Sequence, residues 1–173
     1  MASPGPSSHP VDNAKMDDMN TSNFPLVPLV VTPEDATPVK PFGLDMRVML
    51  STEASGGTTS IIMATHNPGE GPPDHLHLSQ EEFIFIVDGT YDIRIDGTQY
   101  TAGAGTLLFI PRGTVHSFKN VGTTPARMLD WSLPGGQDHY FKAIDALAGE
   151  SGFDRAKAVE ISREHDTHFP QPG

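Results

Sequence analysis

The sequence predicts an all-β fold, an antiparallel β-sandwich or β-barrel, followed by short C-terminal helices. The middle of the chain consists of short runs rich in β-branched, aromatic and aliphatic residues, separated by Gly, Pro, Asn and Asp. Asp88-Gly89 and Asp96-Gly97 are dipeptides typical of tight turns between antiparallel strands. Residues 91–96 alternate between apolar and polar types, which predicts a strand with one face toward water and the other toward a core.

The N-terminal part of the chain is expected to lie outside the core. Residues 1–23 are rich in Pro, Ser, Asn and Asp and have no hydrophobic period, which predicts a flexible arm. The stretch that follows, FPLVPLVVTP, is apolar, but Pro25 and Pro28 have no backbone N–H to donate. It therefore predicts an edge strand or a packing arm, which could cover a sheet edge of a second subunit. A homodimer is expected on this ground.

Residues 24–136 are expected to form one β-barrel. At 173 residues the chain is long enough for one domain with a core, but short for two. Seven β-rich runs follow one another at similar spacing, with no helical segment between them. They span residues 45–51, 58–65, 81–89, 90–97, 105–111, 115–120 and 126–133.

Short helices are expected after the barrel. A Pro-Gly-Gly turn ends the last run, and from there the hydrophobic period lengthens, so that Tyr140, Ile144 and Leu147 fall on one helical face. Residues 153–165 predict a second helix before the Pro-rich end. The helical tail, residues 137–173, is expected to pack on the outside of the barrel.

The composition argues against two classes of partner. Eleven Lys and Arg residues stand against 22 Asp and Glu residues, and the net charge of -11 comes without any basic run that could neutralise phosphates or anionic lipids. Neither nucleic acid nor a membrane is an expected partner. Because the chain has no cysteine, any metal must be bound by nitrogen and oxygen atoms. The N-terminal residues do not show the signal-peptide pattern, which is a positively charged segment followed by an apolar stretch, so a cytoplasmic protein is expected.

Three histidines and a glutamate form a candidate metal site. His75 and His77 are two residues apart, so on a strand their side chains point to the same face and can bind one ion. Glu82 begins an apolar run, where an inward-pointing carboxylate needs a cation or several hydrogen bonds. His116 follows a second turn, IPRGTV. One divalent transition metal, Fe, Mn, Ni, Co, Cu or Zn, suits such a ligand set.

The same residues also have a simpler interpretation. Histidines on solvated strand ends and a surface glutamate would match a short His-x-His pattern by chance. Glu81 is a rival to Glu82 as the carboxylate of the site.

The spacing around these residues resembles the paired motifs of the cupin superfamily. In the first stretch, Gly69, five residues, His75-x-His77, four residues, Glu82, six residues and Gly89 follow in order. In the second, Gly105, five residues, Pro111-x-Gly113, two residues, His116, three residues and Asn120 follow in order. Only Glu82 keeps the six-residue spacing to Gly89, so it is preferred to Glu81. The segments GPPDHLH and LPGGQDHYFKAI further resemble single-domain, quercetinase-like cupins.

This resemblance implies a small β-barrel or jelly roll with a metal held by His75, His77, Glu82 and His116. It also implies a dioxygenase that brings a small enol, flavonol or other aromatic substrate to O₂, with Glu82 as the catalytic group that takes the substrate's hydroxyl proton. Two alternatives remain: a non-oxidative isomerase, cyclase or decarboxylase that uses the metal as a Lewis acid, and a small-molecule-binding protein without turnover.

Several other histidines and aromatic residues are expected to have ordinary structural roles. His66 could be a fifth ligand or a donor behind the ligands, but its loop context predicts a solvent-facing side chain. Phe109, Phe118 and Trp131 could line an aromatic pocket, but each is expected to be plain core. The histidines of the tail are expected on the surface: His139, His165 and His168.

Overall fold

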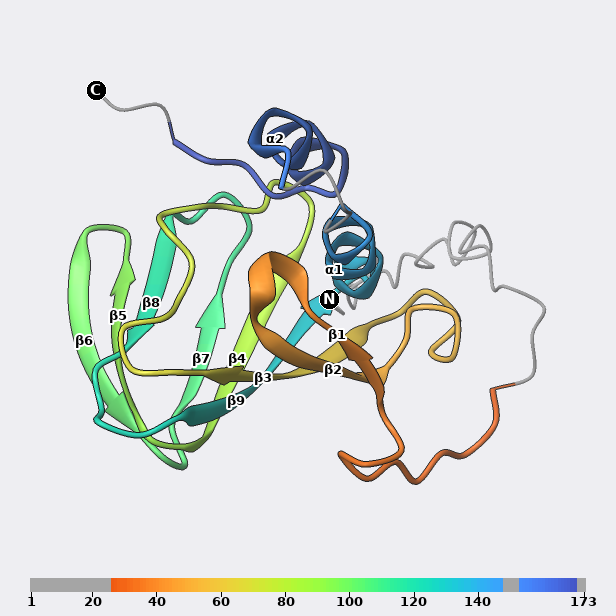
Figure 1. The fold of residues 1–173 in the computed structure, drawn as a ribbon, viewed down its shortest axis with the longest axis horizontal. Helices are drawn as coiled ribbons and strands as arrows, with labels where there is room; N and C mark the ends of the chain where they lie inside the picture. The colour runs from red at the N-terminus through yellow and green to blue at the C-terminus, as the bar shows by residue number, and fades with distance from the viewer. Residues whose placement is uncertain (1–25, 148–152, 171–173) are drawn as a thin grey trace, which may run out of the picture.

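The computed structural model describes residues 26–147 and 153–170. The predicted flexible arm, residues 1–23, lies outside the described residues. Two antiparallel sheets form the body of the molecule, with two helices beside them (Figure 1). The strands are β1 (Thr37–Val39), β2 (Asp45–Leu50), β3 (Ser60–His66), β4 (Glu81–Asp88), β5 (Thr90–Ile95), β6 (Thr98–Gly103), β7 (Leu107–Ile110), β8 (His116–Asn120) and β9 (Ala126–Leu133).

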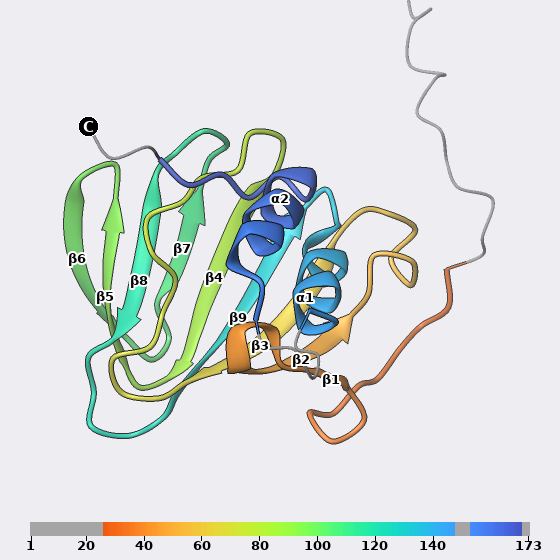
Figure 2. The ribbon, with the colours of Figure 1, turned by 45° about the horizontal axis from the view of Figure 1, so that its top comes forward.

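The larger sheet has the strand order β1-β2-β3-β9-β4-β7, and the smaller sheet has the order β6-β5-β8 (Figure 2). Each of the seven runs predicted from the sequence forms a strand. Strands β1 and β6 were not predicted from the sequence. The β6 segment TQYTAG is mostly exposed at a sheet edge, and an edge strand needs few of the apolar residues by which strands are recognised.

The core lies between the two sheets and follows the strand period of two. On β3 and β4 every second residue is buried, and Ile62 and Ile84 are both 0% exposed. Side chains of the smaller sheet, among them Ile93 and Phe118, belong to the same buried cluster. Each such aliphatic side chain contributes about 1.5–3 kcal/mol by burial. The sequence prediction of an all-β fold with short C-terminal helices is confirmed.

The two Asp-Gly turns make different connections between strands. Asp96 and Gly97 both have positive φ and join β5 to β6, which pair as a hairpin. Gly89 also has positive φ, but β4 and β5 do not pair, because they belong to different sheets. The hairpin predicted at Asp88-Gly89 is therefore wrong: this turn carries the chain from one sheet to the other.

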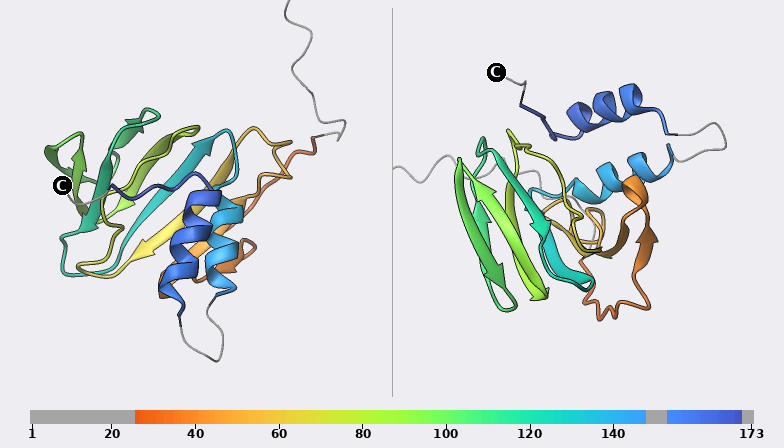
Figure 3. Two further views of the ribbon diagram at one scale, coloured as in Figure 1. Left: turned by 90° about the horizontal axis from the view of Figure 1, so that it is seen from above. Right: turned by 60° about the vertical axis from the view of Figure 1, so that its left-hand side comes forward.

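Two helices, α1 (Gln137–Asp145) and α2 (Arg155–Glu164), lie side by side outside the sheets (Figure 3). Tyr140, Ile144 and Ala158 form a second buried cluster between them, separate from the barrel core. The Asp154 side chain accepts a hydrogen bond from the backbone N–H of Lys157 and so caps the first turn of α2. No helix of the described residues is long and apolar enough to cross a membrane.

Two expectations about apolar residues differ from the structure. The edge strand, one of the two alternatives for the stretch after the arm, is absent over residues 26–31, and Leu26, Val27, Leu29 and Val30 are exposed. The other alternative, an arm that packs on a second subunit, stays a prediction. Phe109, which was expected to be core, is not. It is 54% exposed on the outer face of the larger sheet, where its ring contacts Phe83. The period of two shows which residues share a face of a strand, but not which face is covered.

Candidate metal centre

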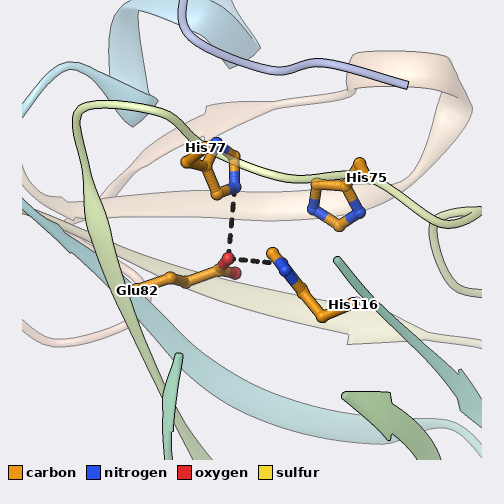
Figure 4. A group of neighbouring side chains, drawn as sticks. All are labelled: His75, His77, Glu82 and His116. Carbon is orange, nitrogen blue, oxygen red and sulfur yellow. Dashed lines mark ion pairs between the residues drawn. The ribbon is translucent and has the colours of Figure 1, made fainter. Parts of the chain in front are cut away.

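Four side chains from two separate segments of the chain converge inside the barrel (Figure 4). His75 and His77 lie in the loop before β4, Glu82 is the second residue of β4, and His116 is the first residue of β8. Backbone hydrogen bonds between His75 and His116 in both directions fix the loop to β8. One nitrogen or oxygen atom of each of the four side chains lies within 4.8 Å of the others, and all four side chains are buried.

The three imidazole rings are oriented by backbone carbonyl groups. The Nδ1 atoms of His75, His77 and His116 lie 3.0, 2.9 and 3.0 Å from the carbonyl oxygens of Pro73, Asp166 and Thr114, respectively. A carbonyl oxygen can only accept, so each Nδ1 carries a proton, and in the neutral ring Nε2 is left with a lone pair. This is the tautomer that binds metal through Nε2, with the other ring nitrogen held from behind.

Glu82 lies in direct contact with two of the rings. Its Oε2 atom is 2.7 Å from His116 Nε2 and 3.2 Å from His77 Nε2. Burial alone would raise the pKa of Glu82, but the His116 and His77 rings lower it well below its usual range. Burial also lowers the pKa of His75 to about 4, which keeps that ring neutral.

The donor set fits a divalent metal ion. When the ring of His116 is neutral, the lone pair on its Nε2 points at a lone pair on the Glu82 oxygen. Two facing lone pairs repel each other, so a proton or a metal ion is needed between these two atoms. Neither atom has a hydrogen-bond partner with acceptable geometry. Three neutral imidazoles and one carboxylate are ligands suited to the first-row divalent metals. The cluster of His75, His77, Glu82 and His116 could therefore bind a metal.

The two neighbouring glutamates point in opposite directions, as the period of a strand requires. Glu82 faces inward to the histidines, whereas Glu81 forms an ion pair at 2.6 Å with Arg112 on the outside. Glu82, and not Glu81, is thus the carboxylate that joins the cluster.

A segment near the C-terminus holds the loop that carries His75 and His77. The Asp166 carboxylate accepts hydrogen bonds from Leu78 N at 2.9 Å, from Ser79 N and Oγ at 2.8 and 2.7 Å, and from Gln80 N at 3.1 Å. Burial would raise the pKa of Asp166, but the hydrogen bonds from Ser79 and Leu78 lower it. This role of Asp166 was not predicted, since nothing in the sequence relates it to a loop that lies almost 90 residues earlier.

A cavity of about 1400 Å³ is bordered by three residues of the cluster, His75, His77 and Glu82. Apolar side chains such as Ala64, Ile93 and Phe118 form part of its wall. Phe118 is thus both buried core and cavity wall, whereas Trp131 is only partly buried and stacks on Phe83. Charged side chains such as Arg94 and Arg155 form other parts of the wall. A cavity that combines apolar walls with polar groups is typical of small-molecule sites.

Two further polar side chains of this cavity were missed. Asp130 of β9 accepts a hydrogen bond at 2.9 Å from Gln137, the first residue of α1. Burial and the negative charge of Glu82 raise the pKa of Asp130 well above its usual range. Asp130 could have been found from the sequence, because it alternates with Ala126 and Met128 and so occupies an inward position. For Gln137 the sequence contains no comparable signal.

The prediction for His66 is wrong. The residue lies at the end of β3, is 1% exposed and borders the cavity. Among the other histidines, His139 and His168 are partly exposed, and His139 forms an ion pair with Glu53 at 2.5 Å. Glu53, Asp138 and His139 form a second group of potential ligands, but Lys142 neutralises Asp138 at 2.8 Å, which leaves little affinity for a cation.

Comparisons with known proteins now identify the family. A family model described as cupin domain matches residues 62–132. The polyketide synthase protein CurC of Streptomyces cyaneus is 30% identical over 147 residues, which cover 84% of this chain and 95% of CurC. The protein is a cupin. The family prediction made from the two motifs is thereby confirmed.

Two other similarities extend this result. The cupin is 27% identical to quercetin 2,3-dioxygenase of Bacillus subtilis over 117 residues, which cover 68% of this chain but 34% of that enzyme. Its fold resembles the solved structure of the polyketide cyclase RemF from Streptomyces resistomycificus, with a TM-score of 0.53 and 21% identity over 62% of this chain and 80% of RemF. The relatives of this cupin thus include enzymes.

Proposed function

We propose that His75, His77, Glu82 and His116 hold one divalent transition metal, and that this cupin is a metal-dependent enzyme for a small enol, flavonol or other aromatic substrate. The observation that carries the proposal is the orientation of the three rings. Each directs Nε2 to the centre because its Nδ1 proton is bound by a backbone carbonyl. Histidines that served only to fill the core would not need this common orientation.

The reaction that we propose is dioxygenation, in which both atoms of O₂ enter the product. When bound, the metal would supply positive charge that acidifies a substrate hydroxyl and open positions suited to redox chemistry. Glu82 would accept the hydroxyl proton, because it is the ionised carboxylate of the cluster. The apolar wall at Ala64, Ile93 and Phe118 would exclude water from the reacting atoms.

The second candidate is a non-oxidative ring closure. It is favoured by the similarity to CurC over nearly its whole length and by the fold shared with the polyketide cyclase RemF. In that reaction the metal would act as a Lewis acid, and Glu82 would again move a proton. Both candidates require an enolisable, largely aromatic small molecule, and they differ in whether O₂ is consumed.

We also propose that the cupin forms a homodimer. Leu26, Val27, Leu29 and Val30 are exposed in a single chain, and a second subunit could cover them. Deleting residues 1–23 should leave the dimer intact, whereas deleting residues 1–31 should weaken it. A monomer at micromolar concentration in sedimentation analysis of the intact chain would contradict this proposal.

The proposed function is tested with Glu82→Gln and its neighbour Glu81→Gln as matched control. Protein purified from metal-replete medium should contain about one metal ion per chain by elemental analysis. Glu82→Gln should keep part of the metal, while its turnover rate on a panel of flavonols and enols should fall by a factor of roughly 10²–10⁴. Glu81→Gln should behave as the wild type, because its ion pair with Arg112 lies outside.

Three outcomes would contradict parts of this proposal. Failure to bind any of the six candidate metals would refute the metal site. Turnover that proceeds equally well without air would refute dioxygenation and favour the ring closure. Equal loss of activity in Glu82→Gln and Glu81→Gln would show that activity does not depend on the carboxylate that points into the cluster, and would refute the role of Glu82 as the base.

A further inference from the structure

His66 borders the cavity and has a polar ring atom that the metal cluster does not use. Its ring is almost fully buried, and the backbone carbonyl of His66 accepts a hydrogen bond from Asn120 Nδ2 at 2.8 Å. On the ring, Nδ1 lies 3.2 Å from the hydroxyl of Tyr91. The other ring nitrogen, Nε2, is buried and has no partner. A buried polar atom left without a partner is unfavourable, so its presence calls for an explanation.

The ring of His66 is neutral. Burial lowers its pKa to about 4, and the Glu70 carboxylate raises it too little to offset this. Burial also raises the pKa of Tyr91, so the phenol keeps its proton. With one ring nitrogen in contact with Tyr91, the neutral imidazole presents the other as a single donor or acceptor. Tyr91 therefore explains how the ring is held, but not why Nε2 is left free.

The position of His66 is set by strand β8. The residues of β8 that face inward are His116, Phe118 and Asn120 in turn. The ring of His66 contacts that of Phe118 with a centroid distance of 5.5 Å, and its backbone is bound to Asn120. Two to four residues along a strand correspond to roughly 7–13 Å. His66 is therefore separated from the metal cluster by about the length of two fused aromatic rings.

Part of the wall between these two ends is apolar. Ala64 precedes His66 on the same face of β3, and Ile93 of β5 is paired with Phe118 of β8. All three side chains border the cavity, as do His66 and Glu82, and charged side chains such as Arg94 and Lys119 also line it. The cavity thus places apolar side chains between the carboxylate of Glu82 and the unpartnered ring nitrogen of His66. This pattern is complementary to a flat aromatic molecule with an oxygen at each end.

We propose that His66 is a substrate-binding residue, whose Nε2 forms a hydrogen bond with a phenolic hydroxyl or ring ketone at the end of an aromatic substrate remote from Glu82. The proposal rests on the proposed function, since it names the substrate class of the same cavity. It selects substrates with two oxygen functions on opposite ends of a fused ring system. It applies equally to dioxygenation and to ring closure.

Two naphthols serve as probes for the test. 2,6-Dihydroxynaphthalene has a hydroxyl at each end, and 2-naphthol lacks one of them. Affinities are measured by calorimetry without air, on protein of known metal content, so that turnover does not interfere. The wild type should bind the dihydroxy probe about tenfold or more tightly than 2-naphthol, as expected when a ligand hydroxyl satisfies a buried polar atom.

Three variants make the test specific. In His66→Phe the ratio of affinities should fall to about twofold, the statistical advantage of two equivalent hydroxyls. His66→Gln, which keeps a polar end, should retain part of the preference and also serves if the Phe variant fails to fold. The control His139→Gln removes a partly exposed histidine outside the cavity wall and should keep the wild-type ratio.

The proposal is overturned if the wild type binds both probes equally, if neither probe binds at millimolar concentration, or if His66→Phe keeps the full preference. Failure of the proposed function has a different signature. If no oxygen-dependent turnover is found on any substrate, the difference between the probes should still appear, because binding of the far hydroxyl does not depend on the reaction.

Discussion

Replacing Asp166 with asparagine should loosen the loop that carries His75 and His77. The change is almost isosteric, and asparagine tolerates the positive φ of 58° at this position, so backbone strain is not introduced. An amide has one acceptor oxygen instead of two. It can therefore keep the bonds made to one carboxylate oxygen of Asp166, but not those made to the other, and it loses the negative charge.

The size of the effect follows from the bonds that are lost. Leu78 N binds one oxygen of Asp166, while Ser79 and Gln80 bind the other. Losing a charged acceptor for one or more such bonds costs about 1–3 kcal/mol. For a chain of this length that corresponds to roughly 2–12 °C in Tm. Because the Asp166 carbonyl also orients His77, metal affinity should fall by about 10–100-fold.

The assay is metal titration of the apo protein together with thermal unfolding of the apo and metal-loaded forms. Glu160→Gln is the matched control, because it removes an exposed carboxylate from the adjacent helix α2 and should change neither quantity. Unchanged metal affinity in Asp166→Asn would refute the reasoning that this segment positions His77. A loss of stability in the apo form alone would assign Asp166 a purely structural role.

The effect of Asp166 should also depend on pH in a defined direction. Its pKa in the folded protein lies below the ordinary value of 3.8. The stabilisation is therefore fully present above that value and is lost as the pH falls through the lower pKa of the folded state. The difference in unfolding free energy between wild type and Asp166→Asn should be constant near neutral pH and shrink in acid below about pH 4.

Two further predictions concern stability. Gly89→Ala would place a Cβ 2.2 Å from the Cβ of Ala126, at a residue whose φ is 84°. Strain and overpacking should therefore lower the free energy of unfolding, measured in urea, by an amount on the order of 3 kcal/mol. A variant with the wild-type urea midpoint would contradict the close approach of Gly89 to Ala126. The ring of His66 is neutral in the folded protein, and between pH 6.5 and 4 only the unfolded chain binds a proton there. The free energy of unfolding of the wild type should therefore fall by up to about 3 kcal/mol as the pH falls from 6.5 to 4. His66→Gln should remove that part of the acid sensitivity, and identical pH profiles for the two proteins would speak against the burial of this ring.

Much of the fold could be predicted from the sequence, because strand patterning is local. The alternation on residues 91–96 predicted β5, and the dipeptide Asp96-Gly97 predicted the tight turn after it, although the strand that follows this turn, β6, was not predicted. The same patterning failed at Asp88-Gly89, where the turn joins two sheets. A turn signal describes two residues, whereas the sheet to which each strand belongs depends on partners far along the chain.

For the candidate site, the sequence by itself determined the set of four side chains through their spacing and their residue types. His75 and His77 were expected on a strand, but they converge from the loop before β4. The spacing that resembles the cupin motifs favoured Glu82 over Glu81, because only Glu82 is separated from Gly89 by six residues. That inference needed no knowledge of the rest of the molecule.

Only the tertiary structure decided what surrounds those side chains. The carbonyl of Asp166 orients His77 from 89 positions away, and the buried ring of His66 borders the cavity although its surroundings in sequence suggested a loop in water. Phe109, with the same apolar character as Phe118, is exposed where Phe118 is buried. The physical reason is common to all three: a residue type fixes what a side chain can do, but its burial and its partners depend on which distant segment packs against it.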